Sequence, residues 1–305
     1  MAVLVARNEQ VAEKRRKSVS KSGLLSHYLL LMPAFLLSAA IVLIPAIFTF
    51  VIAFTDWDGV ATTVNFVGTE NFREIFADGV FLTALFNNVK WTILFLTIPV
   101  AIGLMVAVLL LNRPRSRIVF QTLFLLPYVM AAAVNAIIWL NMIYSPISGI
   151  VGVLNRAGID IANPLTDTSS ALYAVAAVDI WHYWGYLLII YLAALRQVPY
   201  EQVEAARLDG ANSFHIFRYV YLPGIASALK MSLIMIVIFS FLTFDYVYLM
   251  TQGGPANSTE ILATYAYGFA FSTFQFGKAA AVGLIMSGFG LIASIVYVRV
   301  TKRKD

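Results

Sequence analysis

Two acidic side chains stand in stretches of the chain that carry no other charge. Asp179 lies in the apolar run 171–195, and Asp245 lies in the apolar run 231–250. Carboxylates in such helices normally face a cavity or a partner, because burying an unpaired charge is costly. At helical spacing around them stand polar and aromatic residues, namely His182, Tyr183, Tyr186, Phe241, Phe244 and Tyr248. Carboxylates and imidazole bond hydroxyl groups, and aromatic rings lie against apolar C–H faces, so this set could hold a ligand that offers both.

The depths of the two acids agree with a shared site. If the two runs form antiparallel helices, Asp179 lies roughly 12 Å and Asp245 about 8 Å below the same end, at 1.5 Å per residue. Asn135 and Asn141, in the corresponding half of the run 118–144, add side-chain amides. A plainer interpretation stays open. The tryptophans and tyrosines can form an aromatic belt at a membrane interface, and Asp179 can simply bond His182 one turn on.

An enzymatic interpretation is weaker. An intramembrane hydrolase would need Asp179 and His182 as a base pair and Ser240 as the nucleophile. Neither a Gly-x-Ser-x-Gly nor a His-Glu-x-x-His motif occurs, and the other histidines, His27 and His215, are far away in the sequence. The chain has no cysteine, which excludes thiolate catalysis and zinc–thiolate sites. We therefore expect neither a catalytic nor a metal site.

A second constellation interrupts the apolar sequence between Pro199 and Pro223. Pro199 suits the start of a helix, and the glutamates that follow it stand near the positive end of that helix. Gly210 allows the positive φ that ends a helix, and Asn212 or Ser213 can cap a second one, which Pro223 ends. A helix this short is marginal alone. The pattern predicts a helix–turn–helix that docks on a partner.

The composition indicates what positions these residues. Sixty per cent of the 305 residues are hydrophobic, 12% are charged and the mean hydropathy is +0.81, whereas a soluble chain has roughly 25% charged residues. Apolar runs of about 20 residues or more can cross a membrane as helices. The sequence therefore predicts an all-α integral membrane protein with six spans, at 28–54, 91–111, 118–144, 171–195, 231–250 and 279–298. The shorter aromatic segment 261–276 is expected to be extracytoplasmic or partly re-entrant.

The basic residues orient these spans. One alternating set of loops and tails holds 17 of the 21 Lys and Arg residues, and such segments stay in the cytoplasm. Both termini and the loop 196–226 are thus predicted to be cytoplasmic. The same distribution explains the net charge of +5 without any nucleic-acid partner. The expected segments are a basic tail over 1–26, the first span with its outer loop over 27–80, and a core domain over 81–305.

The spacing in the cytoplasmic loop resembles that of a known family. Glu-Ala-Ala at 204–206 is followed by Gly210, the aliphatic Val220 and Leu-Pro at 222–223, as in the coupling loop of ABC importer permeases. The segments 251–255 (Thr-Gln-Gly-Gly-Pro), 276–280 and 65–72 are similar to elements of the carbohydrate-uptake type. The chain resembles the first-named permease subunit of maltose- and glycerol-3-phosphate-type importers. It departs from the family in having Val220 where Ile is favoured and in lacking the large extracytoplasmic insertion of the maltose subunit.

The resemblance implies a type I importer permease fold in a bacterial cytoplasmic (inner) membrane, and half of a sugar translocation pathway working by alternating access. Implied partners are a second permease subunit of different sequence, an ATPase dimer, an extracytoplasmic solute-binding protein and a sugar. ATP and Mg²⁺ would bind to the ATPase, since this chain has no Gly-x-x-x-x-Gly-Lys-Ser/Thr loop. The residues implied to contact the ATPase are Glu204, Ala205, Ala206, Asp209, Gly210, Leu222 and Pro223. The residues expected along the substrate path are Asp179, His182, Tyr183, Tyr186, Phe241, Phe244, Asp245, Tyr248 and Asn135.

A proton-coupled secondary sugar carrier is the alternative function. It would use Asp179 and Asp245 as proton carriers, but it predicts internal repeats, which the sequence does not display. It also has no use for the Glu204 loop. Co-purification of an ATPase distinguishes an importer subunit from a carrier.

Overall fold

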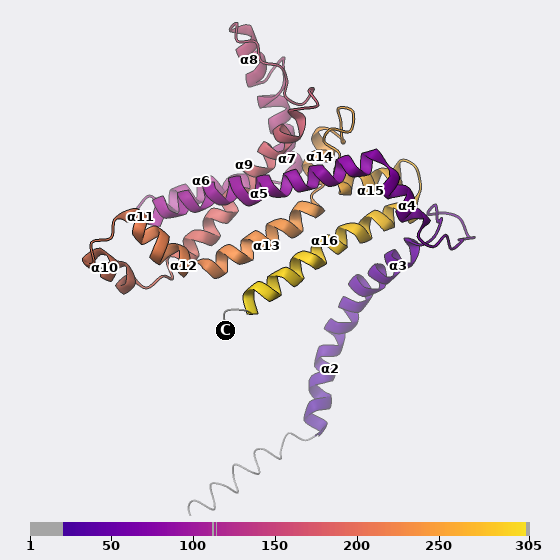
Figure 1. Cartoon of the computed structure of the whole chain (residues 1–305), viewed down its shortest axis with the longest axis horizontal. Coiled ribbons are helices and arrows are strands. Elements are labelled where there is room, and N and C mark those ends of the chain that lie inside the picture. Colours follow the sequence, from indigo (N-terminus) through magenta and orange to yellow (C-terminus); the bar gives the residue numbers. More distant parts are fainter. Residues whose placement is uncertain (1–20, 112, 114, 303–305) are drawn as a thin grey trace, which may run out of the picture. The chain divides into compact units, whose positions relative to one another are not determined.

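The computed structural model describes residues 21–111, 113 and 115–302, and these residues are almost entirely helical (Figure 1). Most of the basic tail predicted for 1–26 lies outside them. The chain divides into two compact units, Met1–Val51 and Ile52–Asp305. The boundary predicted at residue 80 is a functional division that stays a prediction.

The first unit supplies one span. Helix α2 (Lys21–Ser38), the π-helical turn η1 (Ala39–Leu43) and α3 (Ile44–Ile52) follow one another without a break. The stretch Tyr28–Ile52 is long and apolar enough to cross a membrane. The π turn stands just before Pro45, which has no N–H to donate to the preceding turn.

The second unit contains the other predicted spans. Its helices are α4 (Glu70–Ala77), α5 (Gly79–Leu111), α6 (Arg117–Val129), α7 (Ala132–Ile138), η2 (Trp139–Ile143), α8 (Ile150–Arg156), α9 (Ala171–Leu195), α10 (Tyr200–Leu208), α11 (Ser213–Ile216), η3 (Phe217–Tyr221), α12 (Leu222–Gly224), α13 (Ala226–Leu242), α14 (Asp245–Met250), α15 (Leu262–Phe271) and α16 (Phe276–Lys302). The predicted fourth span coincides with α9, and the sixth lies within α16. The second begins at Gly79, twelve residues earlier than expected.

Two predicted spans are broken rather than continuous. The third consists of α6 and the pair α7–η2, which meet at an angle of 96°. Met130 and Ala131 between them have extended backbone, with ψ of 144° and 143°. The fifth stops at Leu242, and α14 begins only at Asp245, after Thr243 with ψ of 137°. Four helices among the described residues can cross a membrane singly, and there are up to six spans if two bent pairs, Arg117–Val129 with Ala132–Ile143 and Ser213–Gly224 with Ala226–Leu242, each count as one.

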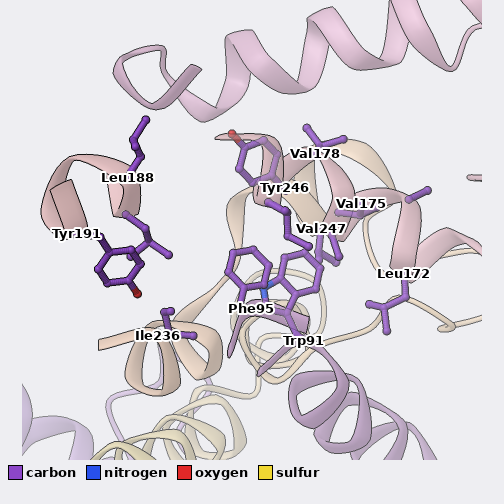
Figure 2. Packing of buried hydrophobic residues seen from close by; sticks show 14 of the residues in the cluster. Trp91, Phe95, Leu172, Val175, Val178, Leu188, Tyr191, Ile236, Tyr246 and Val247 are labelled. Carbon is purple, nitrogen blue, oxygen red and sulfur yellow. The ribbon is translucent and has the colours of Figure 1, made fainter. Parts of the chain in front are cut away.

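Helix α9 is the element against which the site is assembled, because it packs on α5, α6, α13, α14 and α7. Glycine permits the closest of these approaches: a Cβ atom on Gly185 would lie 1.9 Å from the carbonyl oxygen of Phe124 on α6. The core of this region joins Trp91 and Phe95 of α5 to Val178 of α9 and to Tyr246 of α14 (Figure 2). The contacts fix α5, α9 and α14 around one centre.

The two ends of the bundle differ in character. At one end, α10–α12 form a compact loop structure, and α12 meets α13 at a bend near Ile225, where the angle between Ser213–Gly224 and Ala226–Leu242 is 70°. At the other end lie α4, the start of α5 and α15 (Figure 1). Helix α15 packs on α16, α5 and α13. It covers most of the aromatic segment for which an extracytoplasmic or re-entrant position was predicted.

Candidate functional site

A cavity of about 380 Å³ opens where the two broken spans meet α5 and α9. Its walls are Trp91, Phe95, Tyr128, Ala132, Asp179, His182, Tyr183, Ile236, Phe239, Ser240, Leu242, Thr243, Phe244, Asp245 and Tyr246. Tyr128 and Ala132 flank the first break, and Leu242 and Asp245 flank the second. Both breaks therefore lie at the wall of this one cavity, which we call the inner cavity.

Asn135 closes the break between α6 and α7. Its side-chain amide donates one hydrogen bond to the carbonyl oxygen of Pro127 (3.0 Å) and one to the hydroxyl oxygen of Tyr246 (3.2 Å). An uninterrupted helix would use the Pro127 carbonyl four residues on, at Ala131, where the chain is extended. Asn135 is fully buried, so it satisfies a backbone group that the break exposes and ties α7 to α14.

The break between α13 and α14 has a matching side chain. Asn88 on α5 is fully buried and donates to the carbonyl oxygen of Ser240 at 2.7 Å. Its own carbonyl oxygen accepts from the backbone N–H of Leu262 at 2.8 Å. Irregular backbone at membrane depth is tolerated only where its polar groups are satisfied or face a cavity. The two asparagines meet this requirement from opposite sides.

Asp179 and His182 lie one turn apart on α9 and both face the inner cavity. The closest atoms, Oδ1 of Asp179 and Nδ1 of His182, are 3.6 Å apart, and the side chains are 16% and 17% exposed. That distance exceeds the 2.7–3.2 Å of a hydrogen bond. Within the described part of the chain, Nδ1 of His182 has no hydrogen-bond partner. Both groups therefore have bonding capacity left for a ligand.

Aromatic rings make up much of the remaining wall. Trp91 and Phe95 stack with centroids 5.5 Å apart, and Phe95 lies 5.9 Å from Tyr183. Tyr128 of α6 lies 5.1 Å from the ring of His182 and stacks on Tyr186 at 4.7 Å. The sequence analysis did not select Tyr128. Tyr128 directly follows Pro127, one residue before α6 ends, and the sequence alone does not show that the helix breaks there.

The structure gathers some of the predicted path residues and separates others. Asp179, His182, Tyr183, Phe244 and Asp245 line the inner cavity. The other four do not. Tyr186 stacks on Tyr128, and Phe241 stacks on Phe289 at 4.6 Å in another core cluster. Tyr248 bonds Tyr267 in a second cavity, and Asn135 is fully buried. A role for these four on the substrate path stays a prediction.

The inner cavity has a definite chemistry. Its polar side chains are two carboxylates, an imidazole and hydroxyls, and no Lys or Arg is among its lining residues. No group of three or more His, Cys, Asp or Glu residues that could hold a metal ion occurs in the described ranges. Acceptors placed beside flat aromatic faces suit a neutral molecule rich in hydroxyl groups.

The loop 196–226, which is predicted to be cytoplasmic, has the helix start, turn and cap that its sequence predicts, but Pro223 does not end the second helix: it lies inside α12, which continues to Gly224. Pro199 immediately precedes α10. Gly210 lies in the turn that follows α10 and has φ of +82°. Asn212 caps α11: its Oδ1 accepts from the backbone N–H of His215 at 2.9 Å. The chain then runs through η3 and α12 into the bend at Ile225.

The surface of this loop carries exposed apolar groups. Val203 and Ile216 are buried between its helices. Leu208, Phe214 and Tyr219, in contrast, are 84%, 69% and 69% exposed. The predicted coupling residues Glu204, Ala205, Asp209, Gly210 and Pro223 are exposed, and Ala206 and Leu222 are half-buried. Apolar side chains in such numbers on a small helical loop are typical of a surface that a partner covers.

One protein-family profile matches the part of the chain that contains both the helical core and the loop 196–226. The profile, described as "Binding-protein-dependent transport system inner membrane component", matches residues 91–305. The match contains the inner cavity and the loop 196–226.

Individual relatives agree. A probable ABC transporter permease protein of Pyrococcus horikoshii is 34% identical over 272 residues, which cover 88% of this chain and 93% of the relative. A diacetylchitobiose uptake system permease protein of Streptomyces coelicolor is 33% identical over 80% of this chain and 73% of its own length.

Among solved structures, a chain of a bacterial ABC transporter involved in the import of the acidic polysaccharide alginate has the same fold. Its TM-score is 0.82 at 21% identity, and the match covers 95% of this chain and 99% of that one. This chain thus shares its overall fold with a chain of a solved membrane transporter.

Proposed function

The chain belongs to the binding-protein-dependent transport system inner membrane components, the permeases of ABC importers, and on this premise we propose that it conducts a sugar through the inner cavity. As a permease it is a transport subunit rather than the ATP-hydrolysing enzyme. The family assignment favours the importer over the proton-coupled carrier that the sequence left open.

The observation that carries the sugar assignment is the inner cavity itself. Asp179, His182 and Asp245 converge there beside the faces of Phe95 and Tyr183. Carboxylate and imidazole groups bond sugar hydroxyls, while the rings cover the C–H faces of a pyranose. The diacetylchitobiose permease among the relatives supports a carbohydrate substrate for this chain.

The loop 196–226 supports the proposal that a partner ATPase powers transport. The segment from Glu204 to Gly210, with Leu208 and Phe214 exposed beside it, would dock on an ATPase subunit that binds ATP and Mg²⁺. ATP closes the ATPase dimer, and its tighter binding to the closed state shifts the permease towards the outward-open state. A loaded solute-binding protein delivers the sugar, and hydrolysis resets the permease inward.

This chain would form half of the pathway, and a second permease subunit of different sequence would form the other half. The cavity walls come from six helices of this chain, α5, α6, α7, α9, α13 and α14, so this half has its own sugar contacts. The partner subunit closes the cavity from the remaining side.

Sugar uptake tests the proposal. The transporter is assembled in proteoliposomes from this chain and the subunits encoded with it, with the binding protein outside and ATP inside. Radiolabelled N,N′-diacetylchitobiose, maltotriose and xylobiose are offered separately, with labelled histidine as the control solute. We expect ATP-dependent accumulation of at least one sugar and none of histidine.

An ATPase variant that binds but does not hydrolyse ATP should abolish this uptake. Accumulation of histidine with none of the sugars contradicts a carbohydrate substrate. Uptake driven by a proton gradient without ATP would instead restore the carrier hypothesis.

A further inference from the structure

A second cavity, of about 420 Å³, lies at the end of the bundle opposite α10–α12. The start of α5, the loop after α14 and helix α15 form it. Its lining residues are Asp78, Val80, Tyr248, Gln252, Asn257, Glu260, Thr264, Tyr265, Tyr267, Gly268, Phe269, Ser272 and Thr273. We call it the outer cavity, because the predicted orientation places it on the side from which a substrate arrives.

Two carboxylates in the outer cavity are held in place. The hydroxyl of Tyr265 donates to Oδ2 of Asp78 at 2.5 Å, and the hydroxyl of Thr264 donates to Oε1 of Glu260 at 2.6 Å. Glu260 is only 8% exposed, and its backbone oxygen accepts from the side chain of Asn87 at 2.9 Å. A buried carboxylate with fixed backbone and fixed side chain is a pre-organised polar group.

The loop that closes this cavity has unusual backbone. Gln252, Ala256 and Asn257 have φ of +51°, +48° and +60°, a region that costs free energy for residues other than glycine. A Cβ atom on the intervening Gly253 would lie 1.9 Å from Oε2 of Glu260. Such strain persists where the surrounding structure over-determines it, which is common at binding sites. Here it sets Gln252 and Asn257 at the rim of the cavity.

Aromatic rings connect the outer cavity to the inner one. Tyr248 and Tyr267 line the outer cavity with centroids 4.8 Å apart, and their hydroxyls are 3.3 Å apart. Phe244 lines the inner cavity and lies 4.9 Å from Tyr248 and 5.3 Å from Tyr267. The three rings form one aromatic cluster, with Phe244 on the inner cavity and the two tyrosines on the outer one, so aromatic side chains lie between the two cavities.

We propose that the outer cavity is a second carbohydrate subsite, which holds a neutral pyranose before it enters the inner cavity. The inference rests on the proposed function for its substrate class. The amides of Gln252 and Asn257 and the carboxylate of Glu260 bond the hydroxyl groups, and Tyr248 and Tyr267 cover a C–H face of the ring.

The charge of the outer cavity narrows its ligand further. Asp78 and Glu260 are its charged residues, and neither Lys nor Arg is among the lining residues. A uronate would bring a further carboxyl group beside those of Asp78 and Glu260, with no cationic side chain to pair it, so the subsite selects against acidic sugars. The fold is shared with a transporter of the acidic polysaccharide alginate, and this feature would distinguish the two in substrate.

Photolabelling tests the proposal on the assembled transporter in lipid nanodiscs. The probes are diazirine derivatives of N,N′-diacetylchitobiose, maltotriose and xylobiose, and labelled peptides are identified by mass spectrometry. We expect two sets of labelled peptides, one from 248–273 and one from 179–183 and 239–246. A diazirine derivative of digalacturonate should leave 248–273 unlabelled.

Variants separate binding from folding. Tyr267→Ala should lower labelling of the outer cavity about five- to tenfold, the equivalent of one aromatic contact, while inner labelling persists. Gln252→Ala, at an exposed rim position, should lower outer labelling severalfold without disturbing packing. Tyr173→Ala is the matched control, because Tyr173 is 50% exposed and lines neither cavity.

The outcomes distinguish this inference from the proposed function. Labels confined to the inner peptides in the unmodified transporter overturn the outer subsite and leave sugar transport standing. Outer labelling that both variants leave unchanged overturns it as well. Absence of label from both cavities with every sugar probe contradicts the proposed function and, with it, this inference.

Discussion

The side-chain amide of Asn88 on α5 donates a 2.7 Å hydrogen bond to the carbonyl oxygen of Ser240, two residues before α13 ends. A continuous helix would occupy that carbonyl with the N–H of Phe244. The other face of the same amide accepts from Leu262 at the start of α15. One buried residue thus binds both the end of α13 and the start of α15.

Asn88→Ala should destabilise the protein. The substitution leaves the Ser240 carbonyl and the Leu262 N–H buried without this partner, at a cost of about 1–3 kcal/mol for each group. Thermal unfolding in detergent measures the change. Asn141→Ala is the matched control, because the side chain of the exposed Asn141 donates to the carbonyl oxygen of Ile137, one turn earlier in the same span. Equal melting temperatures for the two variants would contradict the role assigned to Asn88.

Gly210→Val should uncouple transport from ATP hydrolysis. Gly210 has φ of +82°, and nothing lies within 4 Å of an added Cβ atom, so the variant suffers from backbone strain of about 1–2 kcal/mol rather than from a clash. Gly158→Val is a close control, since Gly158 has φ of +87° and the same open surroundings in another loop. Sugar uptake and substrate-stimulated ATPase activity are the measurements. Normal values for Gly210→Val exclude this turn as the transmission element.

Asp245 should be needed for transport but not for assembly. Asp245→Asn keeps the shape and one acceptor, so uptake should fall moderately, whereas Asp245→Leu should nearly abolish it, since a lost ligand bond costs about 1–3 kcal/mol. Asp160→Asn, an exposed acid remote from both cavities, should transport normally. Co-purification of the ATPase checks assembly. If Asp245→Leu fails to assemble, the aspartate is structural.

Glu260 should make the stability of the protein depend on pH. Burial raises the pKa of this carboxyl above its ordinary value, against the opposing effect of the hydrogen bond from Thr264. The folded state therefore favours the protonated acid, and this stabilisation is lost as the pH rises through the raised pKa. Glu260→Gln stays neutral, so its melting temperature relative to the natural protein should increase from about pH 5 to about pH 8. A difference independent of pH would argue against this assignment.

Single cysteines can test the orientation, because the chain has none of its own. Thr69→Cys and Ser169→Cys, at exposed positions, should react with an impermeant maleimide in intact cells. Ser213→Cys, exposed in the loop after Gly210, should react only after permeabilisation. Labelling of Ser213→Cys in intact cells would reverse the topology and remove the basis for ATPase docking at this loop.

Much of the framework could be predicted from the sequence, because local chemistry determines it. The span 171–195 is observed as α9, Gly210 adopts positive φ, and Asn212 caps α11. In each case the signal is carried by residues adjacent in the chain. The membrane class followed from composition alone.

The helix breaks could not be predicted in this way. Around the break at Thr243 and Phe244, the segment 231–250 has neither glycine nor proline. The Ser240 carbonyl next to the break is bonded by Asn88, which is 152 residues distant in the sequence. The predicted pattern of Phe241, Phe244, Asp245 and Tyr248 assumed a continuous helix. Because the chain turns within that pattern, Phe241 and Tyr248 face different surroundings from Asp245.

The unequal continuity of α9 and α13 has a mechanical consequence for the two acids of the inner cavity. Helix α9 runs unbroken from Ala171 to Leu195, so a displacement of its Leu195 end is transmitted rigidly to Asp179. Asp245 lies after the helix break at Thr243 and Phe244. A displacement of α13 is therefore not transmitted rigidly to Asp245. A displacement of both helices from the α10–α12 end should therefore change the distance between the two carboxylates. That change would weaken the binding of a molecule in the inner cavity when the pathway changes sides.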